Sequence, residues 1–273
     1  MTVEAFAPAK INLSLHVTGR RADGYHLLDS LVMFADFGDR LQLKAGPELS
    51  LSVSGPFSEG VPCDVRNLVW QAAAGAGWTG RMSLEKHLPH GAGIGGGSSD
   101  AAALLSALAG QGAAIPGGLP LQLGADVPVC MAAQASRMGG IGEQVSAVTL
   151  PRLHAVLVNP RVTVPTPQVF KALSVRENAP MPSDLPSFAT AGDFALWAAQ
   201  QRNDLEAPAI ACQPVIADVL GVLAAQPGGL LTRMSGSGAT CFAIFGSNAG
   251  AVAAARAIAT ARPGWWVKPA TLS

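Results

Sequence analysis

Charged residues are scarce in this chain, and neither sign is in excess. Charged side chains make up 13% of the sequence and hydrophobic ones 49%, with a formal net charge of +0. Such a composition favours well-buried cores and excludes an intrinsically disordered chain. Because there is no basic surplus to attract polyanions, we expect neither nucleic acid nor an anionic membrane as a partner.

Cysteine is also rare. The four cysteines lie far apart and form no Cys-x-x-Cys pair: Cys63, Cys130, Cys212 and Cys241. This spacing is typical of small buried side chains in a reducing compartment, and it argues against a disulfide framework or a zinc site. We therefore expect a cytoplasmic protein.

Targeting and membrane segments are not expected either. The charged residues Glu4 and Lys10 interrupt the start of the chain, so the sequence predicts no signal peptide. The stretch Ala101–Ala125 is uncharged and long enough to span a bilayer. Glycines and prolines between Gly110 and Pro120 divide it, which predicts a short helix followed by a turn in a soluble protein.

The most informative segment is Pro89–Leu105, which reads PHGAGIGGGSSDAAALL. Glycines occupy five of the seven positions from Gly91 to Gly97, and an alanine- and leucine-rich run follows. Glycines let backbone N–H groups approach a ligand, and a helix N-terminus attracts an anion. We expect Ser98 or Ser99 to cap that helix. The segment therefore predicts a phosphate-binding loop.

Other interpretations of the glycine segment are a flexible linker and a dinucleotide site. Gly91-x-Gly93-x-x-Gly96 matches the G-x-G-x-x-G fingerprint, which also needs an acidic residue about 20 positions later. No Asp or Glu lies between Asp100 and Asp126. A Walker A loop is excluded because no glycine run ends in Gly-Lys-Ser/Thr. A nucleoside triphosphate held by a different glycine loop fits best.

Mixed elements without regular βαβ repetition predict an α+β architecture. Strands are expected at Phe6–Val17, Leu31–Phe37, Leu41–Lys44, Met82–Leu88, Val127–Ala132, His154–Val158, Leu230–Met234 and Thr240–Phe245. Helices are expected at Asn67–Gly75, after the glycine segment, and at Phe194–Gln200, Pro214–Ala224 and Ala249–Ala261. A fresh apolar strand after Pro151 predicts two domains, 1–150 and 151–273.

Two charged residues stand in apolar surroundings. Lys10 and Asn12 lie two positions apart on one strand, so their side chains point the same way. A strand lysine is commonly a solvated surface charge, but the small apolar residues before Lys10 favour a buried approach to an anion. Asp126 lies between a helix signal and an apolar stretch, where the common role of an aspartate is in a turn.

Three separated segments resemble the GHMP kinase superfamily: Pro8–Asn12 (PAKIN), Pro89–Ala103 and Met234–Cys241 (MSGSGATC). Further segments are similar to the branch of that superfamily that acts on CDP-methylerythritol: Pro8–Leu31, Leu123–Pro128, Val164–Phe170 and Arg202–Glu206. The most specific of them is Arg21–His26, RADGYH. Small departures occur at His90 and Ile94, and Gly110–Leu119 is shorter than usual.

The resemblance implies a two-domain α+β kinase fold with the active site in the interdomain cleft. It implies transfer of the ATP γ-phosphate, with Mg2+, to the 2-hydroxyl of CDP-methylerythritol, a step of the non-mevalonate route to isoprenoids. Asp126 is similar to the catalytic aspartate and Lys10 to its partner. The residues similar to ATP-binding positions are Lys86, Pro89, Gly91, Gly93, Gly95, Gly96, Gly97, Ser98 and Ser99. Those similar to substrate-binding positions are Asn12, Tyr25, His26, Thr166 and Phe170.

Alternatives remain for single residues and for the function. Tyr25 could pack in the core, and Lys86 could be a solvated strand lysine. The protein could phosphorylate a simpler alcohol such as homoserine or mevalonate, or act as a metabolite sensor that retains the fold without catalysis. A nicotinamide-dependent oxidoreductase is a more distant alternative. The sequence assigns no metal ligands and no oligomeric state.

Overall fold

The computed structural model of the chain describes residues 2–273. They divide into two compact units, each assembled from separate stretches of sequence. Unit 1 holds residues up to 10, 37–90 and 95–133, and unit 2 holds 11–36, 91–94 and 134–273. These units do not coincide with the continuous segments 1–150 and 151–273, because two strands, β1 and β3, each run from one unit into the other.

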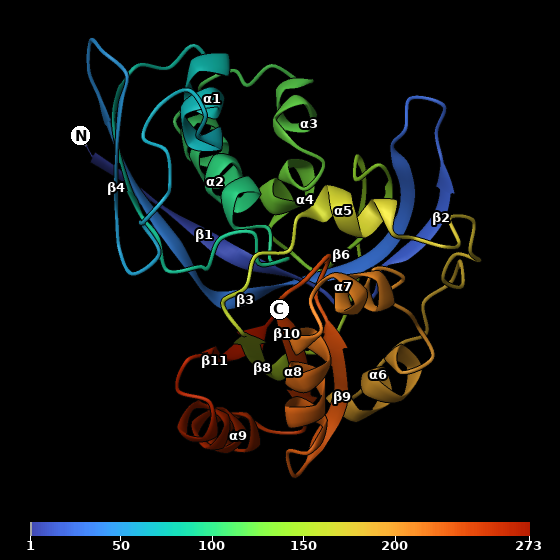
Figure 1. Cartoon of the computed structure of the whole chain (residues 1–273). Coiled ribbons are helices and arrows are strands. Elements are labelled where there is room, and N and C mark those ends of the chain that lie inside the picture. Colours follow the sequence, from blue (N-terminus) through green and yellow to red (C-terminus); the bar gives the residue numbers. More distant parts are fainter. Residues whose placement is uncertain (1) are drawn as a thin grey trace. The chain divides into compact units, whose positions relative to one another are not determined.

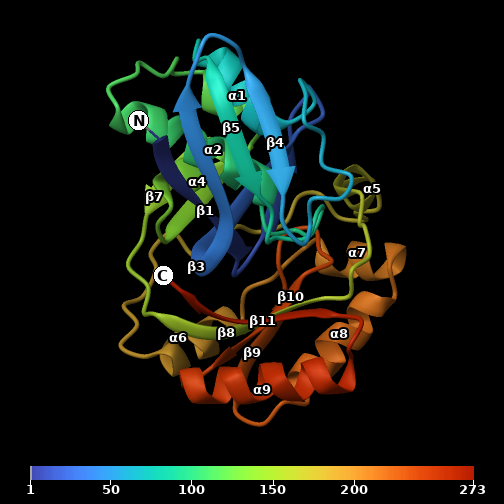
Figure 2. The same ribbon diagram turned by 90° about the vertical axis from the view of Figure 1, so that its left-hand side faces the viewer.

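Unit 1 combines a small sheet with four helices. Its elements are β1 (Thr2–Asn12), the second half of β3 (His26–Ala45), β4 (Ser50–Ser54), α1 (Leu68–Gly75), β5 (Gly80–Glu85), α2 (Gly96–Gly110), α3 (Leu119–Leu123) and α4 (Val127–Ala132). β3 pairs antiparallel with β5, which pairs parallel with β4. α1 and α2 pack together behind these strands (Figure 2). Apolar side chains alternate along β5, where Met82 and Leu84 are buried and their neighbours are exposed.

The predicted strands Leu31–Phe37 and Leu41–Lys44 are parts of one strand, β3, which spans 20 residues. The residues between them do not interrupt it. At Gly38 a Cβ would collide with the backbone of Ala7, so glycine allows β1 to lie close beside β3.

Unit 2 holds the remaining elements. They are β2 (His16–Arg20), the first half of β3, β6 (Ser136–Gly140), β7 (Gln144–Ala147), β8 (Leu153–Asn159), α5 (Thr166–Lys171), α6 (Ala191–Ala198), α7 (Glu206–Cys212), α8 (Val215–Ala224), β9 (Gly229–Met234), β10 (Cys241–Phe245), α9 (Asn248–Ala261) and β11 (Trp266–Leu272). Four antiparallel strands lie in the order β11–β8–β10–β9. α8 and α9 pack against them (Figures 1 and 2).

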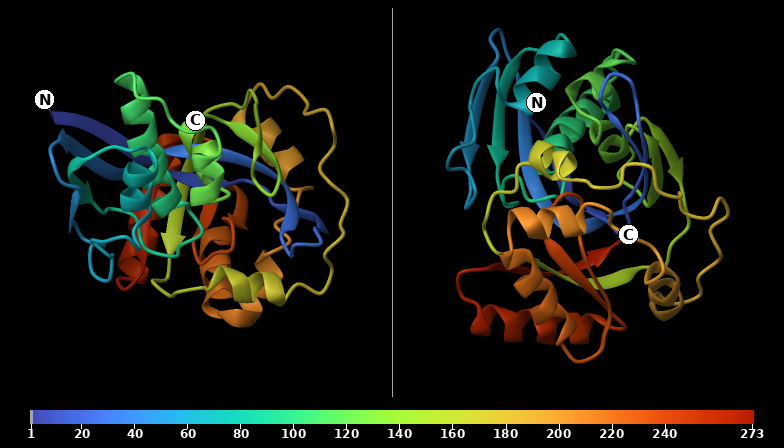
Figure 3. Two further views of the ribbon diagram at one scale, coloured as in Figure 1. Left: turned by 90° about the horizontal axis from the view of Figure 1, so that it is seen from above. Right: turned by 45° about the vertical axis from the view of Figure 1, so that its right-hand side comes forward.

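The core of unit 2 follows from its sequence. β8 is a continuous apolar run in which Ala155, Val156, Leu157 and Val158 are all fully buried. Burial on both faces explains why this strand shows no polar alternation. After α5 the chain runs as a coil past β2 to α6, as the view from above in Figure 3 shows.

Three local predictions were wrong. Val127–Ala132 is the helix α4 and not a strand, because Pro128 suits a first helical turn and an apolar run of six residues fits either element. The predicted strand Phe6–Val17 is interrupted after Asn12 and resumes at His16 as β2. Between the two strands, Leu15 forms an isolated β-bridge with Asn203. Neither Ser98 nor Ser99 caps α2, because that helix already begins at Gly96.

Candidate active site

Lys10 and Asp126 form an ion pair in unit 1. The Lys10 Nζ atom lies 2.7 Å from Asp126 Oδ1. Lys10 is only 3% exposed, so the alternative of a solvated surface lysine is wrong. The Asp126 side chain, which directly precedes α4, keeps 34% of its surface exposed. The pair therefore combines a buried cation with a carboxylate that remains accessible to a ligand.

The glycine segment ends against this ion pair. Gly91, Gly93 and Gly95 have φ angles of 54°, 71° and 65°, a region that favours glycine. A Cβ on Gly95 would lie 3.3 Å from the Lys10 Cβ, so the end of the loop touches the lysine stem. No side chain caps α2, which leaves its first N–H groups available to an anion.

The other predicted ATP-binding residues surround the same helix start. Pro89 and Ser99 are buried, Gly96 and Ser98 are half-buried, and Gly97 is exposed. The Ser99 hydroxyl donates a hydrogen bond to the Pro8 carbonyl at 2.7 Å. It therefore ties α2 to β1, a role that the sequence did not indicate.

Lys86 is buried beneath the loop, so the alternative of a solvated strand lysine is wrong. It is 3% exposed and donates hydrogen bonds to Asp39 and, at 2.7 Å, to Asp100 Oδ2. Asp39 Oδ1 also accepts a hydrogen bond from the Leu88 backbone N–H at 2.9 Å. The sequence did not indicate Asp39 in β3 or Asp100 in α2, because no local pattern distinguishes a buried aspartate from an exposed one.

The charges of this cluster affect one another strongly. Burial raises the pKa of Asp100 to about 8, with the nearby Asp39 adding to the shift and Lys86 opposing it. Burial disfavours the charge on Lys86, but the two carboxylates outweigh it and raise the pKa of Lys86. Asp100 Oδ1 is buried without a hydrogen-bond partner among the described residues.

In unit 2, Ser235 links the glycine segment to β1. Its hydroxyl donates to the Gly93 carbonyl at 2.9 Å and accepts from the Asn12 N–H at 3.1 Å. The Asn12 Nδ2 donates to Ser30 Oγ at 2.8 Å, whereas its Oδ1 is buried with no partner in the described part of the chain. Asn12 therefore presents an unsatisfied acceptor.

The turn that follows Ser235 is held by hydroxyl and amide groups. Thr166 Oγ1 and Ser237 Oγ lie 2.8 Å apart. The Asn203 Nδ2 donates to the carbonyls of Met234 and Gly236, at 2.8 and 2.9 Å. The exposed Thr166 thus lies beside the Ser-Gly-Ser-Gly turn, and the hydrogen bonds from Asn203 stabilise that turn.

Tyr25, His26 and Phe170 also lie in unit 2. Tyr25 is 58% exposed at the tip of the β2–β3 hairpin, so the alternative of a core tyrosine is wrong. The His26 and Phe170 rings are stacked, with centroids 4.8 Å apart and an interplanar angle of 23°. His26 Nε2 is buried and unpartnered within the described residues. Burial lowers the pKa of His26, as do the charges of Arg20 and Arg176.

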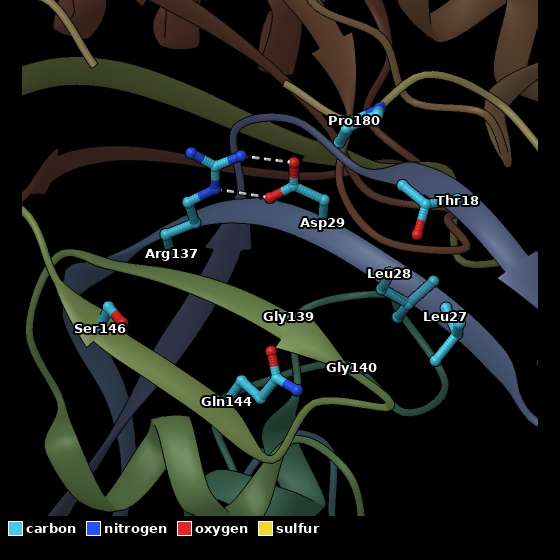
Figure 4. Close-up of a pocket in the computed structure, with 10 residues that line it drawn as sticks. All are labelled: Thr18, Leu27, Leu28, Asp29, Arg137, Gly139, Gly140, Gln144, Ser146 and Pro180. Atoms are coloured by element: carbon cyan, nitrogen blue, oxygen red, sulfur yellow. Dashed lines mark hydrogen bonds and ion pairs between the residues drawn. The ribbon is translucent and has the colours of Figure 1, made fainter. Parts of the chain in front are cut away.

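A cavity of about 490 Å³ opens beside this hairpin (Figure 4). Asp29 from β3 and Arg137 from β6 form a two-pronged ion pair at its edge, with both N···O distances 2.7 Å. Asp29 also accepts the N–H of Met181, and Arg137 donates to the carbonyls of Pro182 and Ser183. The pair thus fastens the coil after α5, a contact that no sequence pattern predicted.

Two family models match the chain. The GHMP kinases N terminal domain matches residues 66–148, and the GHMP kinases C terminal domain matches residues 185–263. The fold and the glycine loop are therefore those of a GHMP kinase.

Comparison with similar proteins identifies one family within the GHMP kinases. The chain is 58% identical to the 4-diphosphocytidyl-2-C-methyl-D-erythritol kinase of Dinoroseobacter shibae, over 99% of this chain and 95% of that one. It is 53% identical to the enzyme of the same name from Paracoccus denitrificans, over 98% and 96% of the two chains. A crystal structure of 4-(cytidine 5'-diphospho)-2C-methyl-D-erythritol kinase matches with a TM-score of 0.80 and 35% identity, over 99% of both chains. The chain belongs to the 4-diphosphocytidyl-2-C-methyl-D-erythritol kinase family.

More distant structures share the fold alone. Homoserine kinase from Cytophaga hutchinsonii matches with a TM-score of 0.67 at 18% identity, over 98% of this chain and 94% of that one. A mevalonate kinase matches with a TM-score of 0.61 at 9% identity, over 100% and 99% of the two chains.

These findings confirm the expected α+β kinase fold and the family resemblance. Membership of a kinase family implies use of ATP, not of a nicotinamide cofactor. The domain boundary after residue 150 lies between the two matched ranges and stays a prediction. Every helix within residues 2–273 falls short of the length and apolar character needed to cross a bilayer.

Proposed function

We propose that the protein transfers the γ-phosphate of ATP to the 2-hydroxyl of 4-(cytidine 5'-diphospho)-2-C-methyl-D-erythritol. The observation that carries the proposal is the Lys10–Asp126 ion pair of 2.7 Å, against which the glycine segment ends. A base, a buried cation and a phosphate-binding loop are the groups that phosphoryl transfer to an alcohol needs. The names of relatives at 58% and 57% identity support this substrate.

Asp126 acts as the general base in this proposal. An alcohol attacks phosphorus better when a carboxylate within hydrogen-bond reach accepts its proton, which contributes about 10²–10⁴-fold. The exposed part of the Asp126 carboxylate is available to that hydroxyl, while Oδ1 is held by Lys10. Lys10 thereby orients the base and adds positive charge close to the reacting phosphate.

The glycine segment and α2 bind the triphosphate. The uncapped N–H groups of α2 and the backbone of Gly91–Gly97 supply hydrogen bonds to phosphate oxygens without the bulk of side chains. Preorganised N–H groups of this kind stabilise charge that develops in the transition state without reorganisation of the protein.

We infer that Mg2+ accompanies ATP. Magnesium prefers oxygen ligands and is commonly bound through phosphates together with one or two carboxylates. When bound, the ion would neutralise phosphate charge.

The cytidine end of the substrate is assigned to unit 2. The exposed Tyr25 ring offers a stacking face, and the unpartnered His26 Nε2 offers a hydrogen bond to a base edge. Phe170 supports His26 by stacking on it. Asn12 and Thr166, with an unsatisfied amide oxygen and an exposed hydroxyl, are assigned to the polar remainder of the substrate. The expected cytoplasmic location stays a prediction.

A coupled assay of ADP release tests this proposal. The full-length protein is given Mg2+, ATP and one of three acceptors: the CDP-linked methylerythritol, homoserine or mevalonate. We expect turnover with the first alone, and a product whose mass is increased by one phosphate. Preference for homoserine or mevalonate would overturn the substrate assignment, and ATP binding without turnover on any acceptor would favour a sensor.

A further inference from the structure

The cluster formed by Asp39, Lys86 and Asp100 buries three ionisable groups in unit 1. Asp39 is 0% exposed, and the other two are 3% exposed. Removing charges from water is costly, and a buried ion pair is weak evidence for stability compared with apolar packing. A cluster this deeply buried therefore calls for another explanation.

The cluster joins the two ends of the glycine-rich stretch Gly91–Gly97, with Asp39 contributed by β3. Lys86, His87 and Leu88 lie immediately before Pro89. The backbone N–H groups of His87 and Leu88 donate hydrogen bonds to Asp39. Asp100 lies in α2, shortly after Gly97. Because Lys86 donates to both carboxylates, one side chain connects the segment's beginning to its end.

The Lys86 ammonium also lies directly under the start of α2. A Cβ on Gly96 would be 3.6 Å from Lys86 Nζ. The side chains of Asp39 and Asp100 already accept hydrogen bonds from this ammonium. These acidic groups weaken the attraction of the Lys86 ammonium for a phosphate. The ammonium instead holds the neighbouring backbone segments together.

We propose that Asp39, Lys86 and Asp100 are positioning residues that hold both ends of the glycine segment in the shape that binds the triphosphate. In this arrangement Lys86 acts through the segment and does not contact the nucleotide. The proposal deepens the proposed function and rests on it for the use of ATP, but it does not depend on which alcohol is phosphorylated.

Nucleotide affinity tests the proposal without any acceptor. The dissociation constant of the non-hydrolysable analogue β,γ-imidoadenosine triphosphate, with Mg2+, is measured by calorimetry on the full chain for Lys86→Met, Asp39→Asn and the double variant. We expect both single changes to weaken binding by about tenfold or more, and the double change to weaken it no further, since the residues act as one unit. Thermal unfolding of each variant is recorded alongside.

A direct Lys86–nucleotide contact predicts a different result. Asp39→Asn would then free the ammonium and leave binding unchanged or tighter, while Lys86→Met alone would weaken it. That outcome overturns the proposal, as does a lower melting temperature with unchanged affinity in every variant, which would show a structural role only.

Two further variants keep the test decisive. Asp100→Ala removes the link to α2 but keeps every hydrogen bond of Asp39, so it serves if Asp39→Asn fails to fold, and it should also weaken binding. Asp29→Asn, which removes a carboxylate that is 7% exposed and paired with Arg137 in unit 2, should leave affinity unchanged. Failure of the proposed function would appear instead as normal nucleotide binding without transfer to the CDP-linked acceptor.

Discussion

The His26 ring covers one face of Phe170, with the two centroids 4.8 Å apart. His26 begins the strand β3, while Phe170 lies in the last turn of the short helix α5. The contact therefore joins two parts of the proposed cytidine site that are distant in sequence. It also leaves the exposed ring of Tyr25 as the stacking surface open to a base.

Replacing Tyr25 with alanine tests this division of roles. We expect the KM for the cytidyl substrate to rise roughly 5- to 150-fold, because one lost stacking partner is worth about 1–3 kcal/mol. The KM for ATP and the melting temperature should hardly change, since Tyr25 is 58% exposed. Tyr25→Phe keeps the ring and should be nearly silent. An equal loss in both variants would assign the hydroxyl, not the ring face, as the important group.

Asp126→Asn tests the general base. The amide keeps the size of the side chain but cannot accept a proton, so kcat should fall by about 10²–10⁴-fold. Calorimetric titrations with each substrate should show binding within a fewfold of the unchanged protein. A kcat within tenfold of the unchanged enzyme would remove Asp126 from this role.

Gly95→Ala tests the glycine segment where it meets Lys10. The φ angle of 65° disfavours alanine, and the new Cβ would lie 3.3 Å from the Lys10 Cβ. We expect a loss of about 1–2 kcal/mol in the free energy of unfolding, together with weaker ATP binding. Gly110→Ala, at the other end of α2, is the matched control because its Cβ would meet nothing within 4 Å. Urea unfolding and ATP titration of both variants test this prediction. Equal unfolding free energies and equal ATP affinities in the two variants would contradict it.

Stability should decline in mild acid because of His16. It is 1% exposed, its Nε2 accepts the Arg202 N–H at 3.1 Å, and burial lowers its pKa, with the Arg202 charge adding to that shift. The unfolded chain then binds more protons than the folded one, so this stabilisation is complete above a pH of about 6.5 and is lost as the pH falls below it. Burial lowers the pKa of His26 and His90 as well, which acts in the same direction. The free energy of unfolding, measured at several pH values, should fall less steeply with decreasing pH for His16→Gln than for the unchanged protein. An unchanged slope would exclude His16 as a cause of the acid sensitivity.

Local patterns and the family resemblance predicted much of the fold. The apolar strand at His154–Val158 and the helix at Ala249–Ala261 match β8 and α9 to within one residue at each end. The family resemblance also predicted the pairing of Lys10 with Asp126, and the structure brings the two together. Their chemical roles stay predictions.

What the sequence could not indicate depends on tertiary contacts. Val127–Ala132 is apolar throughout, and only packing against α2 shows it to be a helix. A solvated Lys86 stayed open as an alternative because its partners, Asp39 and Asp100, lie 47 and 14 positions away. Asp29 and Arg137 are 108 positions apart, and no periodicity links such a pair.

The interleaving of the two units limits how this protein can be divided or recombined. Unit 1 comprises three separate stretches of chain, and the four residues Gly91–Ile94 of unit 2 interrupt it within the glycine segment. A single cut, wherever it is made, leaves at least one unit without part of its sequence. Hybrid enzymes that join the front half of one relative to the back half of another would therefore mix parental residues within one core. Exchanging a whole unit would need several crossovers, at Lys10, Asp36, His90, Ile94 and Ala133.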